Sequence, residues 1–508
     1  MSESAGSSFI RKISGTLFIV ALGFVMVAWI KVSQPFDPDQ VKPASGRLDE
    51  IAIADAKKMP AFAGSVVTLA YHGVSDTDHA GTTLSRELFA EHMRAMKTAG
   101  FQTVTLDQVQ KLVNGESVEL PPKALLLTFD GGHITDWTNV DPVLKELGFN
   151  AVTFLTTSEI VQAGTPSYFL SFDQLKKLRG TGRWEFGSHT DDSANSVDVP
   201  GDVGVSFTNR MMVDGEPETP EQWDDRITAD LARTQDFFKK HLGGPAVAFS
   251  YPNGDPRNSN NLDRIQVRTE KLLKSAGFDY AFYGEDVPSG QVDGVTKNSN
   301  RYRLPRIGVR STTTVATLLK DVRGTIPAPP PANLTQVKWT GPYTVACQTL
   351  KGNLYVYSRE YGNCKLDTVN TTRWRDYTLS TVIKAPINRQ IAFFSVRDGE
   401  GATHTGSLVV AVGRDEMVVR QTLNGGDLVK ELGKADLAAS PTRTVAIKVS
   451  GTGPDNTLVV NITGMAQPLT VKFLPEIVAG GVKFGVDGYL KPLTFFKPQL
   501  KIDQEVAP

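Results

Sequence analysis

Short apolar runs alternate with amphipathic segments between about residues 66 and 323. The runs are apolar on both faces, which is typical of parallel strands covered by helices. The predicted strands are SVVTLAYHG, ALLLTF, NAVTFLTT, RWEFGSH, AVAFSYP and DYAFYG, at residues 65–73, 124–129, 150–157, 183–189, 246–252 and 279–284. Helical patterns separate them, so the sequence predicts an α/β fold, either a barrel of parallel strands or a doubly wound sheet.

Capping residues mark the ends of several predicted helices. Ser85 precedes a segment with helical periodicity, and Gly100 is expected to end it. Asp141 is expected to cap the next helix, with Pro142 in its first turn. A capping box begins at Ser171. These signals divide the segment into regularly alternating strands and helices.

The pattern changes after the proline-rich stretch TIPAPPPAN, so residues 324–334 are predicted to be a linker. Beyond it, apolar residues recur at every second position, as in Val445, Ile447 and Val449. Consecutive segments of this kind, separated by turns, predict an all-β jelly-roll sandwich over residues 335–508.

The beginning of the chain is apolar and uncharged over residues 13–30, directly after Arg11 and Lys12. This pattern predicts a transmembrane anchor at residues 13–32, with a cytoplasmic tail at 1–12 and the bulk of the chain periplasmic or extracellular. A cleaved signal peptide is the alternative. Residues 33–65, rich in proline and charge, are expected to be a linker to the α/β domain.

Charge and cysteine content narrow the function classes. The formal net charge of −1 provides no basic surface for nucleic acid, so that class of partner is set aside. Cys347 and Cys364 are the whole thiol inventory, and their spacing does not suggest zinc. They either form one disulfide, if the compartment is oxidising, or are two small buried side chains.

Polar residues follow the predicted strands of the α/β domain. In a parallel barrel the carboxyl ends of the strands converge on one pocket, which predicts a site there. The residues at these ends are Tyr71, His72, Asp130, His189, Thr190, Tyr251, Pro252, Asn253 and Arg306.

These ends also carry recognisable motifs. LLLTFDGGHITDW, GRWEFGSHT and AFSYPNG resemble the first three motifs of the polysaccharide deacetylases, the NodB-homology group or carbohydrate esterase family 4. YHGVSD and RYRLPRIGV are similar to the branch that deacetylates exopolysaccharide outside the cell. The resemblance covers residues 66–323 and favours a distorted (β/α) barrel over an open sheet.

The resemblance implies metal-assisted hydrolysis of an N-acetyl amide. In the family one aspartate and two histidines hold a divalent metal such as zinc, and a second aspartate is the general base. Asp130 falls on the base, and the amide of Asn253 on the oxyanion site. Tyr251 and Arg306 complete the expected catalytic set. The residues expected to line the substrate site are Tyr71, Thr190 and Pro252.

The metal ligands match only in part. His189 falls on the first metal histidine, but Gly131 stands where the family has its metal aspartate, and Ser193 where a second histidine is expected. His72 and His133 are the candidate replacements, since imidazole is a common zinc ligand.

Three hypotheses follow from this partial match. The first is a membrane-anchored polysaccharide N-deacetylase acting on an N-acetylhexosamine polymer. The second is a catalytically degenerate glycan-binding or scaffold protein in polysaccharide export, and the third is a structural envelope protein. The sandwich resembles the concanavalin-like domains that follow sugar-active modules. Trp339, Tyr361 and Trp374 are its candidate glycan contacts, although Trp374 begins a strand and is also a core candidate.

Overall fold

The computed structural model describes residues 43–504. The exceptions are residues 79, 161–166, 200–201, 255–264, 285–293, 298, 327–330, 343, 359–360, 367–370, 372–373, 388–389, 399–405, 424–427, 452, 475–476, 478–479 and 488–491. The predicted anchor at residues 13–32 lies outside this part of the chain. Within the described residues, no helix is both long enough and apolar enough to span a bilayer.

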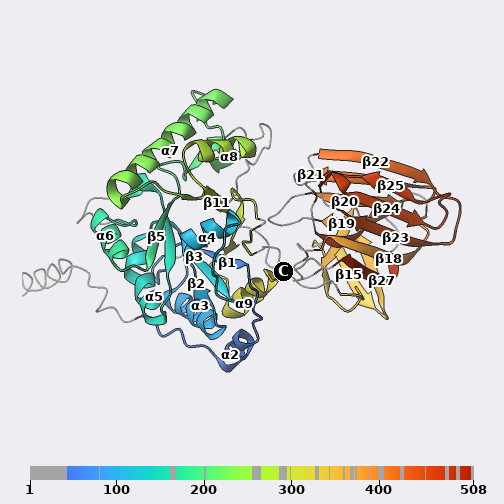
Figure 1. The fold of residues 1–508 in the computed structure, drawn as a ribbon, viewed down its shortest axis with the longest axis horizontal. Coiled ribbons are helices and arrows are strands. Elements are labelled where there is room, and N and C mark those ends of the chain that lie inside the picture. Colours follow the sequence, from blue (N-terminus) through green and yellow to red (C-terminus); the bar gives the residue numbers. More distant parts are fainter. Residues whose placement is uncertain are drawn as a thin grey trace, which may run out of the picture. The chain divides into compact units, whose positions relative to one another are not determined.

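Parallel strands form a barrel-like sheet in the first half of the chain (Figure 1). Its order is β12-β11-β10-β5-β4-β3-β1-β13, and β2 pairs with the start of β3. The bounds are β1 Val66–Tyr71, β2 Gln102–Thr103, β3 Ala124–Gly131, β4 Ala151–Leu155, β5 Trp184–Ser188, β10 Ala248–Ser250, β11 Tyr280–Tyr283, β12 Leu304–Pro305 and β13 Ile307–Gly308. Strands β1, β3 and β4 are buried throughout, as their continuous apolar runs predict.

The barrel closes at Arg306. Strand β12 pairs with β11 at one end of the sheet, and β13 pairs with β1 at the other. Arg306 is the one residue between these two short strands, so the two edges of the sheet meet at this point. The predicted choice between a barrel and an open sheet is therefore decided in favour of the barrel.

Helices cover the outside of these strands (Figure 1). Their bounds are α2 Glu50–Lys57, α3 Arg86–Thr98, α4 Leu106–Val113, α5 Asp141–Leu147, α6 Phe172–Gly180, α7 Pro220–Leu242, α8 Ile265–Ser275 and α9 Val315–Gly324. Helix α2 lies within the segment expected to be a linker, and it buries Ala56. Two short hairpins between β5 and α7 were not predicted: β6 Ser196–Val199 with β7 Asp202–Val205, and β8 Met212–Val213 with β9 Glu216–Pro217.

Two of the predicted helix caps are confirmed and one is wrong. The Ser85 hydroxyl accepts the amide of Leu88, and Ser171 forms its capping box. Asp141 does not cap α5, because a π-helical turn at Asp136–Val140 leads directly into that helix. Its carboxylate instead accepts hydrogen bonds from Arg183, at 2.9 and 3.1 Å, and from the Trp184 indole at 2.8 Å.

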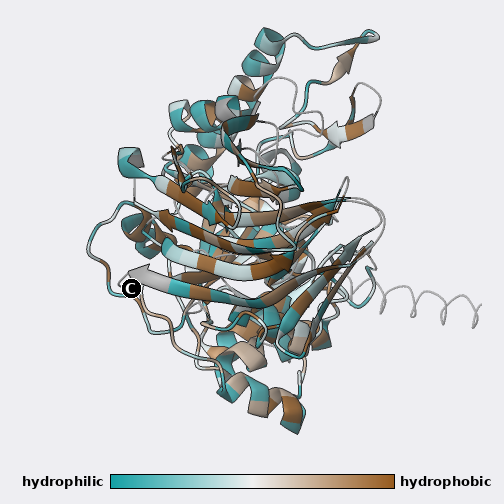
Figure 2. Ribbon diagram, turned by 90° about the vertical axis from the view of Figure 1, so that its right-hand side faces the viewer, coloured by the Kyte–Doolittle hydropathy of each residue, from teal (hydrophilic) through white to brown (hydrophobic). Residues whose placement is uncertain are grey.

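The second half of the chain forms two antiparallel sheets of seven strands each, with the orders β14-β17-β26-β19-β20-β21-β22 and β15-β16-β27-β18-β23-β24-β25. The bounds are β14 Trp339–Thr340, β15 Val345–Leu350, β16 Asn353–Ser358, β17 Gly362–Leu366, β18 Asp376–Lys384, β19 Ile391–Asp398, β20 Ser407–Val412, β21 Glu416–Leu423, β22 Leu428–Asp436, β23 Thr442–Ser450, β24 Thr457–Ile462, β25 Leu469–Lys472, β26 Gly481–Asp487 and β27 Leu493–Gln504. Hydrophobic and hydrophilic positions alternate along the strands (Figure 2). In β23 and β24 every second residue is buried, as predicted.

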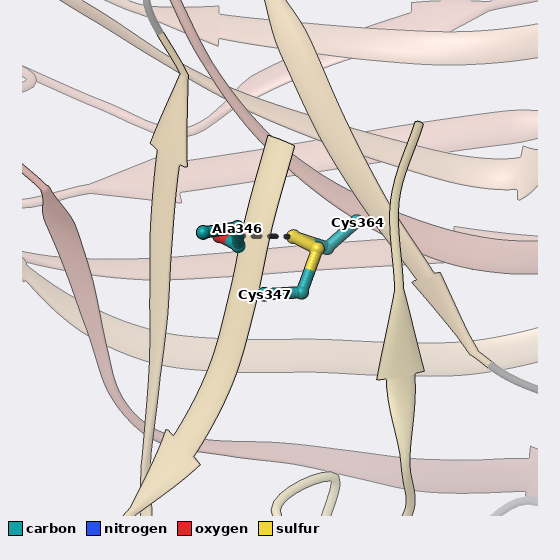
Figure 3. Close-up of a disulfide and its surroundings, with 3 residues drawn as sticks. All are labelled: Ala346, Cys347 and Cys364. Atoms are coloured by element: carbon teal, nitrogen blue, oxygen red, sulfur yellow. Dashed lines mark hydrogen bonds between the residues drawn. A yellow bond between two sulfur atoms is a disulfide. The ribbon is translucent and has the colours of Figure 1, made fainter. Parts of the chain in front are cut away.

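The two cysteines form a disulfide that joins the two sheets (Figure 3). Cys347 lies in β15, the edge strand of one sheet, and Cys364 lies in β17 of the other. Their Cα atoms are 5.9 Å apart. Of the two alternatives open at the sequence level, the disulfide is the one the structure contains.

Candidate active site at the barrel mouth

Asp130 lies at the end of β3 and is held by charge and hydrogen bonds inside the barrel. The Arg306 guanidinium donates to both carboxylate oxygens, at 2.8 and 2.7 Å, and the Ser250 hydroxyl donates to Oδ2 at 3.0 Å. The side chains of Arg306 and Asp130 are 0% and 1% exposed. This two-point geometry fixes the orientation of the carboxylate and compensates its charge in this buried position.

The tertiary fold creates this pair, because the residues are 176 positions apart in the sequence. Arg306 sits at the closure of the barrel, and its guanidinium also donates to the Thr128 hydroxyl at 3.2 Å. Its charged group lies 5.8 Å from the centre of the Phe154 ring. The residue that completes the barrel thus also positions the candidate base.

His189 follows β5 and is fixed by a backbone carbonyl. Its Nδ1 lies 3.0 Å from the carbonyl oxygen of Ser250. A carbonyl only accepts, so Nδ1 carries the proton and Nε2 keeps its lone pair. Burial lowers the pKa of His189, while nearby Asp130 raises it and Arg306 and His72 lower it. A neutral imidazole with its Nε2 lone pair is suited to accept a proton or bind a metal.

His133 occupies the space that a side chain at position 131 would need. A Cβ atom built on Gly131 would lie 2.4 Å from Nε2 of His133. Gly131 also has a φ of +101°, a conformation that side chains disfavour. Burial lowers the pKa of His133 to about 4, with smaller contributions from His72 and His189. An uncharged imidazole therefore fills the space beside Gly131.

Ser193 is engaged in a different network. Its hydroxyl donates to Asp230 at 2.8 Å, and the amides of Asp191 and Asp192 donate to the same carboxylate at 3.0 and 2.8 Å. Asp230 comes from α7, so this loop is held to the helix. The position expected to carry a second metal histidine instead helps to fix the loop that follows His189.

The family's metal ligands therefore do not fit this site. Two of the three positions hold Gly131 and Ser193, which supply no carboxylate or imidazole there. His72, His133 and His189 lie close enough to influence one another's protonation. Within the described residues, however, no three histidine, cysteine or acidic side chains form a group that could hold a metal ion.

The backbone around the mouth adopts left-handed conformations at residues other than glycine. Thr190, next to His189, has a φ of +83°, and Asn253 has a φ of +53°. A β-branched residue in this region is strained, and such strain is concentrated at functional sites. Thr190 and Pro252 are buried, whereas Asn253 is exposed. Of these three, Asn253 is placed to meet a ligand.

Two of the predicted site residues point into the protein interior. Tyr71 is fully buried, and its hydroxyl lies 3.3 Å from Nδ1 of His92. Tyr251 is also fully buried and packs edge-on against Phe249. Its hydroxyl forms no hydrogen bond with any residue that the structure describes. Burial raises the pKa of both tyrosines. Tyr71 ends β1, and Tyr251 directly follows β10.

Asp136 follows Asp130 closely in the sequence and is an alternative candidate for the base, but its burial was not predicted. It is 1% exposed, and its Oδ2 accepts a hydrogen bond from Thr153 at 2.8 Å. Its Oδ1 is buried without a hydrogen-bond partner among the described residues. Burial raises the pKa of Asp136 to about 8, so this carboxyl is largely protonated at neutral pH. No local sequence signal marks it, because the π-turn that buries it is not encoded by a simple motif.

Part of the chain is similar in sequence to known proteins. Residues 117–281 match the family model of polysaccharide deacetylases. This part of the chain belongs to the polysaccharide deacetylase family. A poly-beta-1,6-N-acetyl-D-glucosamine N-deacetylase of Staphylococcus aureus (strain MRSA252) is 25% identical over 226 residues, which is 44% of this chain and 67% of that protein. The enzyme of the same name from Staphylococcus epidermidis is 25% identical over 292 residues, which is 54% of this chain and 90% of that protein.

A solved deacetylase structure resembles the barrel half of the chain. The de-N-acetylase from Aggregatibacter actinomycetemcomitans is 22% identical, with a TM-score of 0.43 over 50% of this chain and 99% of that one. Metal dependence is general among polysaccharide deacetylases, and this chain has Gly131 and Ser193 within the matched residues.

Proposed function

We propose that this polysaccharide deacetylase-family protein removes acetyl groups from an N-acetylhexosamine polymer outside the cytoplasm. The observation that carries the proposal is the Asp130 carboxylate, which Arg306 and Ser250 hold in place beside His189. The printed substrate of the staphylococcal relatives, poly-beta-1,6-N-acetyl-D-glucosamine, supplies the substrate class.

In this proposal Asp130 acts on the attacking water. It accepts a proton as the water oxygen adds to the amide carbonyl carbon. Asp130 then gives this proton to the amide nitrogen as the carbon–nitrogen bond breaks, and the acetic acid and amine that leave exchange a proton to become acetate and a protonated amine. Arg306 holds the carboxylate in the orientation that this transfer needs. The backbone amide of Asn253, in its left-handed turn, donates to the developing oxyanion.

Acetate release from β-1,6-linked N-acetylglucosamine oligomers tests the proposal directly. The full-length protein should release acetate above a heat-denatured control, and Asp130→Asn should abolish the release. Asp173→Asn is the matched control, because Asp173 is an exposed acid in the first turn of α6. The absence of release from the wild-type protein, with or without added zinc, would overturn the proposal.

Gly131 and Ser193 favour a second candidate, a glycan-binding protein derived from a deacetylase. For this candidate, oligomers would bind without acetate release. Their affinity would be unchanged by a chelator and by Asp130→Ala. In the second half of the chain, Trp339 and Trp374 are buried at 5% and 2% exposure, so they are not surface contacts for a glycan. Tyr361 is 54% exposed and is the remaining aromatic candidate there.

Export of the chain is part of the proposal. The disulfide between Cys347 and Cys364 supports it, because disulfides persist in oxidising compartments. The uncharged apolar stretch at residues 13–30 supports an anchor that places the barrel on the outer side. An alkaline phosphatase reporter fused after the last residue should be active in cells, and an inactive, well-expressed fusion would overturn this part.

A further inference from the structure

A short segment, residues 168–170, crosses beside the loop that follows Asp130. The amide of Ile134 donates to the carbonyl of Tyr168, and the amide of Leu170 donates to the carbonyl of Gly132, both at 2.9 Å. These bonds form an antiparallel bridge between His133 and Phe169. The backbone that carries Tyr168 is therefore fixed to the mouth of the barrel.

The Tyr168 side chain is held at its tip and on its ring. Its hydroxyl donates to Oδ2 of Asp78 at 2.8 Å, and its ring centre lies 4.5 Å from that of His133. Asp78 is itself anchored, since it also accepts from the Thr83 hydroxyl at 3.0 Å and the Ala80 amide at 3.1 Å. Hydrogen bonds from Ala80 and Tyr168 lower the pKa of Asp78, as expected for a stable acceptor.

Despite these contacts, Tyr168 is 46% exposed. Among the large apolar side chains exposed on the described barrel residues, it is the one aromatic. An immobilised, exposed ring offers contact area without a further loss of side-chain entropy on binding. The exposed part of the Tyr168 ring therefore does not contribute to the packing of the barrel core.

Tyr168 lies close to Gly73 and His133, two residues near the candidate base Asp130. A Cβ atom on Gly73, directly after His72, would lie 3.4 Å from the Tyr168 hydroxyl and 3.3 Å from Nδ1 of His133. The opposite edge of the His133 ring fills the space at Gly131, the neighbour of Asp130. Tyr168 and His133 thus form a tilted aromatic pair that reaches from the surface to the backbone beside Asp130.

We propose that the ring of Tyr168 is a binding platform for a pyranose ring, which orients the sugar whose N-acetyl group enters the barrel mouth. This inference rests on the proposed function for its substrate class. The C–H groups on one face of a hexopyranose carry partial positive charge, and the face of an aromatic ring carries partial negative charge. Tyr168 is a positioning residue in this arrangement, and Asp78 holds its tip.

Calorimetric titration of the full-length protein with a β-1,6-linked N-acetylglucosamine pentasaccharide tests the platform. Tyr168→Leu keeps an apolar side chain on His133 but removes the aromatic face, and it should weaken binding about five- to tenfold. Tyr168→Phe and Tyr168→Trp should stay within about threefold of the wild type. Tyr357→Ala removes a tyrosine that is 37% exposed on the β-sandwich, and it should leave the affinity unchanged.

The inference is overturned by wild-type affinity in Tyr168→Leu. It is also overturned if Tyr168→Phe loses as much affinity as Tyr168→Leu, because the hydroxyl and Asp78 would then account for binding. Thermal unfolding of each variant confirms that it is folded, and Tyr168→Trp provides the test if Tyr168→Leu is not.

Acetate release separates this inference from the proposed function. If the wild type releases acetate, Tyr168→Leu should raise KM with little change in kcat, as expected for uniform binding. Unchanged KM together with acetate release would overturn the platform and leave the function standing. If the wild type releases no acetate but Tyr168→Leu still weakens binding, the sugar-binding role of Tyr168 is supported and the proposed deacetylase activity is refuted.

Discussion

Gly131 and His133 can be tested as a coupled pair. Gly131→Ala adds one methyl group at a φ of +101°, which costs about 1–3 kcal/mol in backbone strain. The methyl carbon would also lie 2.4 Å from Nε2 of His133. The imidazole cannot move away cheaply, because Tyr168 and Phe169 pack against it at ring distances of 4.5 and 5.6 Å. Displacing it should cost roughly another 1–3 kcal/mol.

A double-mutant cycle isolates the second cost. In the His133→Ala background the overlap is gone, so Gly131→Ala should then cost only the backbone strain. The coupling energy between the two substitutions is therefore expected to be about 1–3 kcal/mol, measured by urea unfolding followed by tryptophan fluorescence. Gly148→Ala is the control, because Gly148 has a φ of +66° but a Cβ there would meet nothing within 4 Å. Its cost should be the same with and without His133.

Additive costs for Gly131→Ala and His133→Ala, within about 0.5 kcal/mol, would refute the reasoning. They would mean that the imidazole does not fill the space at position 131. The replacement of a family carboxylate by a neighbouring histidine would then have no structural basis.

Three further predictions concern the buried charges and the disulfide. Arg306→Ala should destabilise the barrel by about 3–5 kcal/mol in urea unfolding, because it leaves Asp130 buried without its counter-charge. Adding Asp130→Ala to this variant should restore part of the lost stability. If it restores none, the two charges do not stabilise each other. The pKa of Asp136 is raised from 3.8 to about 8, so its stabilising contribution is fully present below pH 4 and is lost as the pH rises through 8. The free energy of unfolding of Asp136→Asn, measured relative to that of the wild type, should therefore rise by a few kcal/mol as the pH is raised from 5 to 8. A difference between the two proteins that stays constant over this range would argue against a buried neutral acid. Replacing Cys347 and Cys364 by alanine should lower the stability of the sandwich by about 3 kcal/mol. In calorimetry, the unfolding transition of the sandwich alone should move to a lower temperature. An unchanged transition would show that the disulfide does not stabilise the sandwich.

The departures from the family pattern have a common consequence for charge. The family places two aspartates side by side, whereas this chain has Asp130 followed by glycine and an imidazole whose pKa is lowered to about 4. At neutral pH the site therefore carries one carboxylate less than its relatives' motif provides. Arg306 already balances the charge of Asp130, so this carboxylate is less available to attract a divalent cation.

Local sequence patterns predicted the main strands and several helices of the barrel half, but not its two short hairpins or helix α2. The capping residue Ser85, the capping box at Ser171 and the fully apolar run of β3 act through neighbours a few positions away, and each is confirmed. The exception, Asp141, failed because a π-helical turn before α5 displaced the start of the helix. A hydrogen-bond pattern that depends on tertiary packing overrode a local preference there.

The sequence by itself determined the alternation of strands and helices, the change to two-residue periodicity after the proline-rich stretch, and the placement of Asp130 and His189 at strand ends. These properties depend on backbone preferences and on side chains close in sequence. Only the tertiary structure decided that Arg306 closes the barrel onto Asp130, that His133 fills the space at Gly131, and that Tyr71 is buried in the core. Those outcomes depend on contacts between residues far apart in the sequence, which form only when the sheet closes, so no local sequence pattern predicts them.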